Sequence, residues 1–275
     1  MKYVVMSFDD GRKDFYTNAL PIIKKYKMQA TLNVVPDYLG KNDMSEFASG
    51  NNECVTAQEM QECAESGCVE IAGHSANHTN DIAEIRRGNA FLRDYFEKQG
   101  MKCENGFASP NSGVYPGNLN QYSELLKDGA VSYIRSGNNV RRDGLLNAGW
   151  YILYSITKSK LAYSIYNRRN VIRIADNKVS DAISKNEYCY PSVTCNAKNT
   201  MKQLKRLIDG MPDESAVIIM FHSILNAYDS GYGMDKWYNT VDEFEDFCSY
   251  LSAADDIMTV TNATLHHMIK ERVHL

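Results

Sequence analysis

Short apolar stretches alternate with stretches of helical periodicity along most of the chain. The clearest strand-like stretches are Tyr3–Phe8, Gln29–Val35 and Ala216–Phe221, and the helix-like stretch Phe15–Tyr26 connects the first two. Parallel strands need crossover connections of this kind, because the chain must return to the starting edge before the next strand begins. The sequence therefore predicts an α/β fold with a parallel sheet, open or closed.

The other elements follow from turn and capping residues. Further strands are predicted at 69–72, 106–109, 131–135, 151–156, 171–174 and 258–260. Further helices are predicted from Thr56 to near Gly67, from Thr79 or Asn80 to Gln99, at 119–127, from Asn196 or Lys198 to Asp209, at 241–251 and from Thr261 to Arg272. Thr56 and Glu59 have the spacing of a capping box.

The length of 275 residues is close to the roughly 250 that are typical of one α/β barrel. Proline- or serine-rich linkers and internal repeats are absent from the sequence, which predicts one domain over 1–275. Residues 137–187 carry few strong signals, and we interpret them as an irregular insert that serves either as a lid or substrate loop or as plain packing.

Composition excludes several classes of protein. With 30 basic and 34 acidic residues the net charge is −4, which argues against a dedicated nucleic-acid binder. No apolar run approaches the roughly 18 residues of a membrane span, and the short apolar start MKYVVMSFDDG is typical of neither a signal peptide nor an anchor. The seven cysteines are odd in number and lack CxxC spacing, so we expect a reducing, cytoplasmic location. The sequence leaves the oligomeric state open.

Polar residues with chemical potential follow three predicted strands. Asp9 and Asp10 follow the first, His74 and His78 the third, and His222 the apolar strand that ends at Phe221. In parallel α/β folds the carboxyl ends of the strands share one edge, where ligands bind. Agreement among three strand ends favours a site at that edge.

His74 and His78 enclose the tripeptide Ser-Ala-Asn, and two imidazoles at this spacing can bind one metal. The alternative is two unrelated surface histidines. Asp9 and Asp10 would repel each other unless a cation compensates one of them, which would leave the other as a base. The alternative interpretation of this aspartate pair is a helix cap beside a surface acid. His222, taken alone, is more typical of a satisfied core histidine.

The four segments SFDDG, HSANH, FASPNSG and IIMFHS, in this order, change these interpretations together. The chain resembles the polysaccharide deacetylases, the NodB-homology family of carbohydrate esterases, over roughly residues 3 to 225. The resemblance implies a distorted (β/α) barrel of about seven parallel strands. It also implies a metal-dependent hydrolase that removes N-acetyl groups from a sugar or polysaccharide.

Carried over residue by residue, the resemblance makes Asp9 the general base and His222 the general acid. It makes Asp10, His74 and His78 the ligands of a divalent metal, with Zn²⁺ favoured and Co²⁺, Ni²⁺ or Mn²⁺ as alternatives. Bound there, the metal would polarise the acetamide carbonyl and lower the pKa of a bound water.

The resemblance also assigns supporting residues. Pro110 and Asn111 are expected at the oxyanion or substrate, through the backbone N–H of Asn111. Ser75 is expected to cap the turn between the histidines and so orient them.

The chain departs from the family in two places. The third segment reads Phe107-Ala108-Ser109-Pro110-Asn111 and lacks the family's arginine, which Arg135 at the next strand end could replace, unless Arg135 forms a surface salt bridge. An acidic residue that tunes the late histidine has no clear match, with Asp143 and Asp176 as weak candidates. Two alternative functions therefore stay open: a hydrolase of another C–N bond, such as a cyclic amide or ureide, and a catalytically inactive carbohydrate-binding relative.

Overall fold

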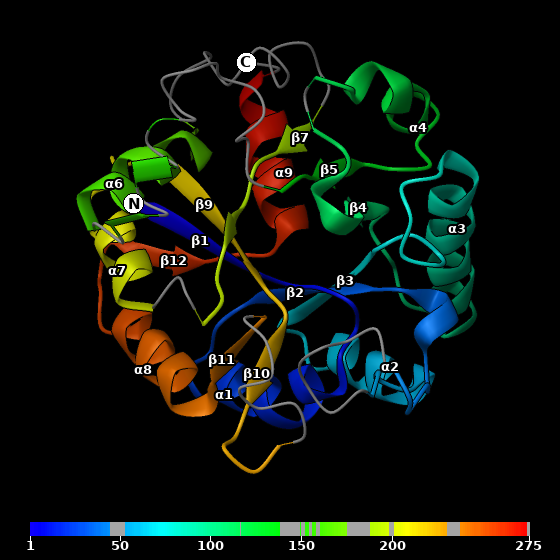
Figure 1. Cartoon of the computed structure of the whole chain (residues 1–275). Coiled ribbons are helices and arrows are strands. Elements are labelled where there is room, and N and C mark those ends of the chain that lie inside the picture. The colour runs from blue at the N-terminus through cyan, green and yellow to red at the C-terminus, as the bar shows by residue number, and fades with distance from the viewer. Residues whose placement is uncertain are drawn as a thin grey trace.

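The predicted strand–helix alternation produces a ring of parallel strands with helices outside it (Figure 1). The computed structural model describes residues 1–44, 53–115, 117–137, 149, 152–153, 156–157, 160–174, 188–197, 201–229 and 237–273. The described residues contain one main sheet, and its neighbours pair in the order β6-β9-β1-β2-β3-β4-β5-β7.

The strands of the ring run parallel to one another. They are β1 (Lys2–Phe8), β2 (Ala30–Val34), β3 (Val69–Gly73), β4 (Gly106–Ala108), β5 (Tyr133–Arg135), β7 (Cys189–Tyr190), β8 (Val193–Thr194) and β9 (Ser215–Phe221). β7 pairs with β5, β8 pairs with β9, and only Pro191 and Ser192 separate β7 from β8. This one stretch of chain therefore closes the ring. Counted as a single strand it gives seven parallel strands, which confirms the predicted distorted barrel.

β1 and β9 form the longest pair of the ring, matched residue for residue from Lys2↔Ser215 to Phe8↔Phe221. Near their amino ends their outer edges are occupied by β12 (Ile257–Thr259) on β1 and by the antiparallel β6 (Val171–Arg173) on β9. Near their carboxyl ends the same edges pair with β2 and β8. The β1–β9 pair is thus flanked along its whole length.

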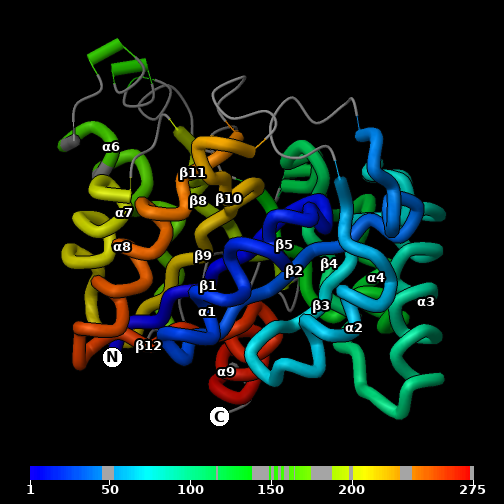
Figure 2. The backbone as a smooth tube through the Cα atoms, turned by 90° about the horizontal axis from the view of Figure 1, so that it is seen from below, coloured from blue at the N-terminus to red at the C-terminus, as the bar shows by residue number. Residues whose placement is uncertain are grey.

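The helices lie mainly around the outside of the ring (Figures 1 and 2). They are α1 (Leu20–Lys25), α2 (Ala57–Glu65), α3 (Ile82–Lys98), α4 (Ser123–Lys127), α6 (Lys160–Asn167), α7 (Met201–Asp209), α8 (Val241–Ser252) and α9 (Asn262–Val273). A π-helical turn, Phe15–Ala19, precedes α1. Figure 2 shows α9 at the opposite end of the ring from β10 (Ser223–Leu225) and β11 (Tyr238–Thr240). Helix α9 therefore covers the amino ends of the strands and leaves the carboxyl ends to the loops.

Three phenylalanines hold the β1–β9 pair against α8. The rings of Phe8 and Phe221 stack with their centroids 5.0 Å apart, and both meet Phe244 edge-on at 5.7 Å. All three side chains are buried. Aromatic pairs of this kind contribute about 0.5–1.5 kcal/mol each beyond the area that they bury. The packing fixes the two strands immediately before Asp9 and His222.

The start of α3 differs from the prediction. The N-cap is Asp81, whose carboxylate accepts hydrogen bonds from the N–H groups of Ala83 and Glu84 at 2.8 and 3.4 Å. Thr79 and Asn80 are also residue types that cap helices. The side-chain amide of Asn80 instead donates a hydrogen bond to the carbonyl of Pro110. The capping box predicted at Thr56 is present.

The predicted strand at 151–156 is wrong in its described part. Ile152, Leu153 and Ile156 are helical, because a short apolar run does not by itself distinguish a strand from a helix. The strand predicted at 171–174 is confirmed as β6. Most of the predicted insert at 137–187, with Asp143 and Asp176, lies outside the described residues, and its role as a lid or substrate loop stays a prediction.

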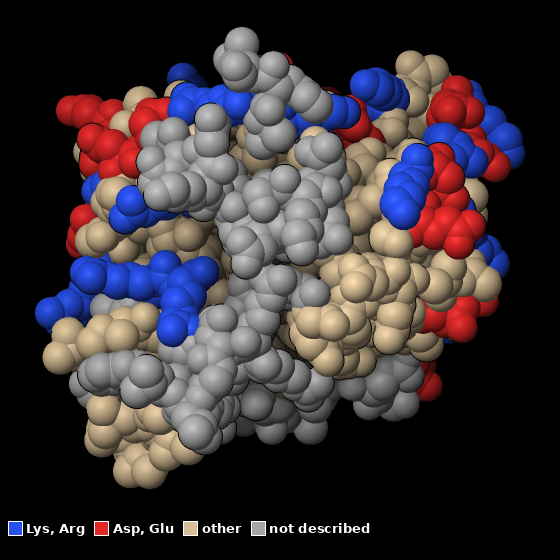
Figure 3. Space-filling model, turned by 90° about the horizontal axis from the view of Figure 1, so that it is seen from above, with Lys and Arg blue, Asp and Glu red and all other residues tan. Residues whose placement is uncertain are grey.

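Side chains of both charges reach the surface. Figure 3 shows acidic and basic side chains mixed along the right-hand edge of one face, and a group of Lys and Arg on its left. Among the described helices, none combines the length and the apolar character that crossing a membrane requires.

Candidate metal and catalytic site

The strand ends bring the predicted site residues to the same edge of the ring. Asp9 and Asp10 follow β1, His74 follows β3, Arg135 ends β5 and His222 follows β9. The N–H of Asp9 donates to the carbonyl of Phe221 at 3.0 Å, which continues the β1–β9 pairing one residue further. Asp9 and His222 therefore leave adjacent strands at the same level.

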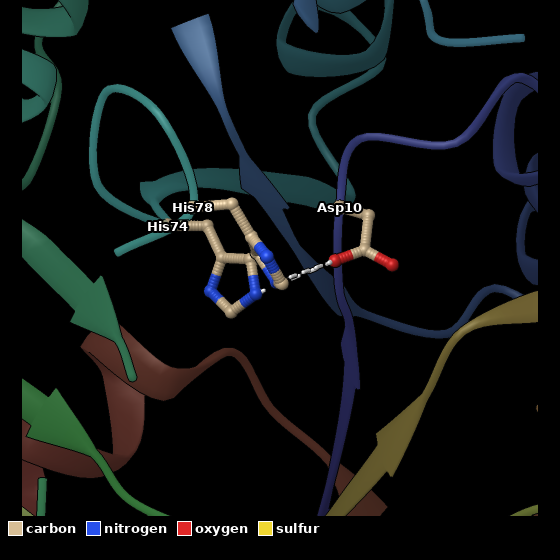
Figure 4. A group of neighbouring side chains, drawn as sticks. All are labelled: Asp10, His74 and His78. Atoms are coloured by element: carbon tan, nitrogen blue, oxygen red, sulfur yellow. Dashed lines mark ion pairs between the residues drawn. The ribbon is translucent and has the colours of Figure 1, made fainter. Parts of the chain in front are cut away.

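Asp10, His74 and His78 form a compact group of ligand atoms (Figure 4). Oδ1 of Asp10 lies 3.5 Å from Nε2 of His74 and 3.4 Å from Nε2 of His78, and one ligand atom from each residue falls within 4.8 Å of the others. Ligands at zinc bond lengths in a tetrahedral shell are about 3.3 Å apart. The distances and the carboxylate–imidazole donor set thus fit a divalent metal ion.

The ring of His74 is held in one orientation. Its Nδ1 lies 2.8 Å from the backbone oxygen of Ala108 at the end of β4. Because a carbonyl oxygen only accepts hydrogen bonds, Nδ1 carries a proton, and this contact turns Nε2 toward Asp10. Both His74 and the neighbouring Ser75 are buried, whereas the His78 side chain is 27% exposed.

The turn between the two histidines is held by a hydrogen bond within it and by close packing against helix α3. The hydroxyl of Ser75 accepts a hydrogen bond from the N–H of Thr79 at 2.9 Å. On the outer side, Gly88 of α3 packs so closely that a Cβ there would lie 2.7 Å from the nitrogen of Ala76. Ala76 also donates its N–H to the carbonyl of Glu84 at 3.0 Å. The turn is therefore fixed against α3.

Arg12 holds the second oxygen of Asp10. Its Nε and Nη2 lie 3.0 and 2.9 Å from Oδ2 of Asp10, and its Nη1 donates to the hydroxyl of Ser223 at 2.9 Å. Burial alone would raise the pKa of Asp10. The positive charge of Arg12 and hydrogen bonds from His74 and His78 outweigh burial and hold that pKa well below its usual range. Sequence reasoning missed Arg12, although it stands two residues after Asp10.

Asp9 is held through its Oδ1. Nη2 of Arg135 lies 2.5 Å from this oxygen, and Nδ2 of Asn33 lies 2.8 Å from it. The side chains of Asp9 and Arg135 are 3% and 0% exposed. Burial raises the pKa of Asp9, but the charges of Arg135, His74 and His222 act the other way and lower it overall. Sequence reasoning missed Asn33, and nothing in the sequence around it singles it out.

His222 lies beside an aromatic ring. Its centroid is 4.8 Å from that of Trp237, and its Nδ1 is buried without a hydrogen-bond partner in the described part of the chain. Burial lowers the pKa of His222 to about 4, against the opposite effect of Asp10 and Asp9. The imidazole is therefore neutral near pH 7. His222 follows Phe221, whose carbonyl accepts the N–H of Asp9, so His222 and Asp9 leave neighbouring strands side by side.

The loop after β4 is tied to the turn that carries His78. The side-chain amide of Asn80 donates to the carbonyl of Pro110 at 2.8 Å, and the hydroxyl of Ser109 donates to Oδ1 of Asn80 at 2.9 Å. Asn111 is exposed and has a φ of 51°. The structure thus brings Pro110 and Asn111 against the histidine turn, while their role at an oxyanion stays a prediction.

Unusual backbone conformations gather around this site. Among the described residues eight non-glycine residues have a positive φ, and five of them belong to the three segments of the site. These five are Asp10, Ser75, His78, Asn111 and Ser112. Left-handed conformations cost free energy for residues with a Cβ and concentrate at functional sites, where surrounding contacts hold them. Their gathering is an independent indication of function.

The sequence model of the polysaccharide deacetylase family matches residues 1–123, which include Asp9, Asp10, His74 and His78. The YxkH protein of Bacillus subtilis (strain 168), whose name places it among the polysaccharide deacetylases, is 35% identical over 77 residues. These residues are 28% of this chain and 24% of that protein. The poly-beta-1,6-N-acetyl-D-glucosamine N-deacetylase of Staphylococcus aureus (strain MSSA476) is 29% identical over 86 residues, 31% of this chain and 27% of that enzyme. The matched segments therefore span about a quarter of these relatives.

A solved structure supports the fold over nearly the whole chain. A polysaccharide deacetylase-like protein of Mycobacterium smegmatis superposes with a TM-score of 0.54 and covers 98% of this chain and 91% of its own. At 12% sequence identity this likeness shows the shared fold alone.

Proposed function

We propose that this chain is a metal-dependent hydrolase of the polysaccharide deacetylase family and removes N-acetyl groups from a carbohydrate; the match of residues 1–123 to the family model supports the proposal. One observation carries the proposal: the Asp10–His74–His78 group lies beside Asp9, a second carboxylate with its own arginine. One carboxylate can then bind a metal while the other stays ionised as a base.

Asp10, His74 and His78 would hold the divalent ion, and Zn²⁺ suits their mixture of nitrogen and oxygen donors. When bound, such an ion supplies polarisation of a carbonyl and acidification of a water molecule. Arg12 would orient Asp10, and the carbonyl of Ala108 would orient His74, before the ion binds. The hydrogen bond from Thr79 to Ser75 closes the turn that carries His78.

Asp9 would take the proton from the attacking water. Its ion pair with Arg135 keeps the carboxylate ionised and therefore ready to accept that proton near neutral pH. In the sequence, the missing arginine of the third segment is the argument for a non-catalytic relative. A guanidinium from β5 now occupies the position beside the base, so that argument loses its basis.

His222 would donate a proton to the departing amine. With a pKa of about 4 it is neutral near pH 7, so the proton that it donates must reach it during the reaction. Asp9, which would have taken a proton from water and leaves the adjacent strand at the same level, would supply it. The backbone N–H of Asn111 and the ring of Pro110 would complete the site on the side of β4.

The substrate that we propose is an N-acetylated sugar or polysaccharide. The Staphylococcus aureus relative is named for poly-β-1,6-N-acetylglucosamine, which favours an N-acetylglucosamine polymer as the first compound to test. Hydrolysis of a cyclic amide or ureide remains the second class, and no contact in the described residues favours it.

The test measures amine release from N-acetylglucosamine oligomers, β-1,4- and β-1,6-linked, by purified protein. We expect turnover that disappears after dialysis against a chelator and returns with Zn²⁺, Co²⁺, Ni²⁺ or Mn²⁺. Asp9→Asn serves as the inactive control. Turnover that survives complete removal of metal, or amine release from small cyclic amides alone, would overturn the proposal.

A further inference from the structure

We propose that Asn33 is a positioning residue that selects which oxygen of Asp9 acts as the base. The proposal rests on the function proposed above. Asn33 lies on β2, one strand away from Asp9, and both side chains are buried. Its amide holds Oδ1 of Asp9 together with Arg135, which leaves Oδ2 for the proton of the attacking water.

Two donors occupy the same oxygen of Asp9. Nδ2 of Asn33 approaches Oδ1 at 2.8 Å, and Nη2 of Arg135 approaches it at 2.5 Å. Oδ2 has no hydrogen-bond donor in the described part of the chain. A carboxylate oxygen that accepts two such donors has both of its lone-pair positions occupied, so the proton goes to the other oxygen.

The amide of Asn33 can face Asp9 in only one orientation. Its Nδ2 is surrounded by three acceptors, Oδ1 of Asp9 at 2.8 Å, the hydroxyl oxygen of Ser7 at 2.8 Å and the carbonyl of Phe8 at 3.0 Å. Its own Oδ1 is buried and has no partner in the described residues. Exchange of the two amide ends would place oxygen against the carbonyl of Phe8 and the carboxylate of Asp9, which is repulsive.

The hydrogen bonds that hold Asn33 continue through the interior of the ring to α9. The hydroxyl oxygen of Ser7 also accepts a hydrogen bond from Nδ2 of Asn262 at 3.2 Å. The backbone N–H of Asn262 donates to the hydroxyl oxygen of Thr31 at 2.9 Å. All these side chains are fully buried. Asn33 is therefore fixed from below by the helix that covers the amino ends of the strands, and it transmits that position to Asp9.

The first experiment compares Asn33→Leu with Asn170→Leu in metal-loaded protein. Leu has the same number and branching of side-chain heavy atoms as Asn and lacks the donor. Asn170 is a fully buried asparagine immediately before β6, which pairs with the amino end of β9. We expect Asn33→Leu to lower kcat by about ten- to a hundredfold with KM within about twofold, because the base is misplaced and the binding surface is not. Metal content per folded molecule should equal that of the wild type. Asn170→Leu should lower thermal stability without lowering kcat.

The second experiment needs neither metal nor turnover and covers the case in which Asn33→Leu fails to fold. The side-chain amide protons of Asn33 are followed by NMR in apo-protein. Asp9→Ala should shift at least one of them strongly, whereas Asp10→Ala, which removes the same charge one residue away, should shift them much less. Equal shifts in the two variants would overturn the contact.

The outcomes separate the two proposals. Absence of turnover by the wild-type protein with every metal and substrate would overturn the proposed function. Wild-type turnover with an unchanged kcat in folded Asn33→Leu would overturn the role of Asn33 and leave the function intact. A loss of metal in Asn33→Leu equal to its loss of activity would make Asn33 a general support of the site and would also overturn its specific role.

Discussion

Nη2 of Arg135 lies 2.5 Å from Oδ1 of Asp9, and neither side chain is more than 3% exposed. The two residues are 126 positions apart in the chain. Transfer of either charge out of water is costly, and each charge compensates for the burial of the other. Nη1 of Arg135 lies 2.9 Å from the sulfur of Met220 on β9, so the guanidinium connects the last residue of β5 to two other strands. The pair therefore links the catalytic chemistry that we propose to closure of the ring.

Arg135→Met should lower activity well beyond any loss of stability. Without the guanidinium the ionised form of Asp9 loses its main compensating charge, so we expect kcat per folded molecule to fall at least tenfold. The free energy of unfolding should also fall, by about 3–5 kcal/mol, because a buried carboxylate loses its partner. Chemical denaturation gives the folded fraction at the assay temperature. Arg93→Met, at an exposed position of α3, is the control. An unchanged rate would show that Arg135 does not act on Asp9.

Asp9→Asn and His78→Ala should separate the base from the metal ligands. Asp9→Asn should abolish turnover and keep the metal, because the carboxylate of Asp9 is not part of the ligand group. His78→Ala should lose the metal, because one of the three ligand atoms is removed. Metal content after dialysis and amine release are measured on the same preparations. Equal metal loss in both variants would contradict the assignment of roles.

Gly88→Ala should weaken metal binding from outside the site. The added Cβ would lie 2.7 Å from the nitrogen of Ala76 and 2.8 Å from the carbonyl carbon of Ser75, so the histidine turn must move. In an open helix the same change would stabilise by about 1 kcal/mol, whereas overpacking costs about 1–3 kcal/mol. We therefore expect a lower melting temperature and about tenfold weaker Zn²⁺ binding, measured by titration. Arg93→Ala on the same helix should change neither. A melting temperature above that of the wild type would show that the turn tolerates the methyl group.

His266 should make stability depend on pH. It is buried among Tyr188, Tyr190 and Tyr133, with Nδ1 2.9 Å from the hydroxyl of Tyr190, and burial lowers its pKa to about 4. In the unfolded chain a histidine has a pKa of about 6.5. As the pH falls from about 6.5 toward 4, the unfolded chain therefore binds a proton at His266 that the folded chain does not bind. Stability from this residue is therefore present above pH 6.5 and lost as the pH falls.

The expected loss is about 1–3 kcal/mol between pH 7 and pH 4.5. Urea unfolding at both pH values measures it in the wild type and in His266→Gln. The variant should lose less stability on acidification, and the remaining loss reports other groups such as His222, whose pKa is also lowered to about 4. An equal loss in both proteins would show that His266 does not titrate in this range.

Local patterns in the sequence predicted the architecture because they are repeated and redundant. The alternation that begins with Tyr3–Phe8 and Phe15–Tyr26 recurs along the chain, so an error in one element, such as the strand expected at 151–156, leaves the parallel ring intact. The cap of α3 shows the limit of local rules. Thr79, Asn80 and Asp81 are all capping residue types, and contacts with Pro110, distant in the chain, decide that Asp81 is the one used.

The residues of the site divide in the same way, into those that local sequence patterns reveal and those that only the structure reveals. Asp9, Asp10, His74 and His78 stand in short motifs whose chemistry is carried by residue type and spacing, so they were found. The sequence does not identify Arg12 and Asn33 as site residues. An arginine after a glycine and an asparagine within a strand are ordinary residues until their partners are known. For Arg135 the sequence leaves two interpretations open, replacement of the missing arginine and a surface salt bridge, and its buried contact with Asp9 decides between them.

The sequence by itself determined the strand ends, and with them the chemistry available at one edge of the ring. Only the tertiary structure decided how that chemistry is arranged. The charge of Asp9 is compensated by Arg135 from β5, its orientation is set by Asn33 from β2, and its neighbour His222 comes from β9. The reason is physical: hydrophobic periodicity is a local property, whereas the energy of a buried charge depends on which groups the fold brings within a few ångströms, however far apart they lie in the chain.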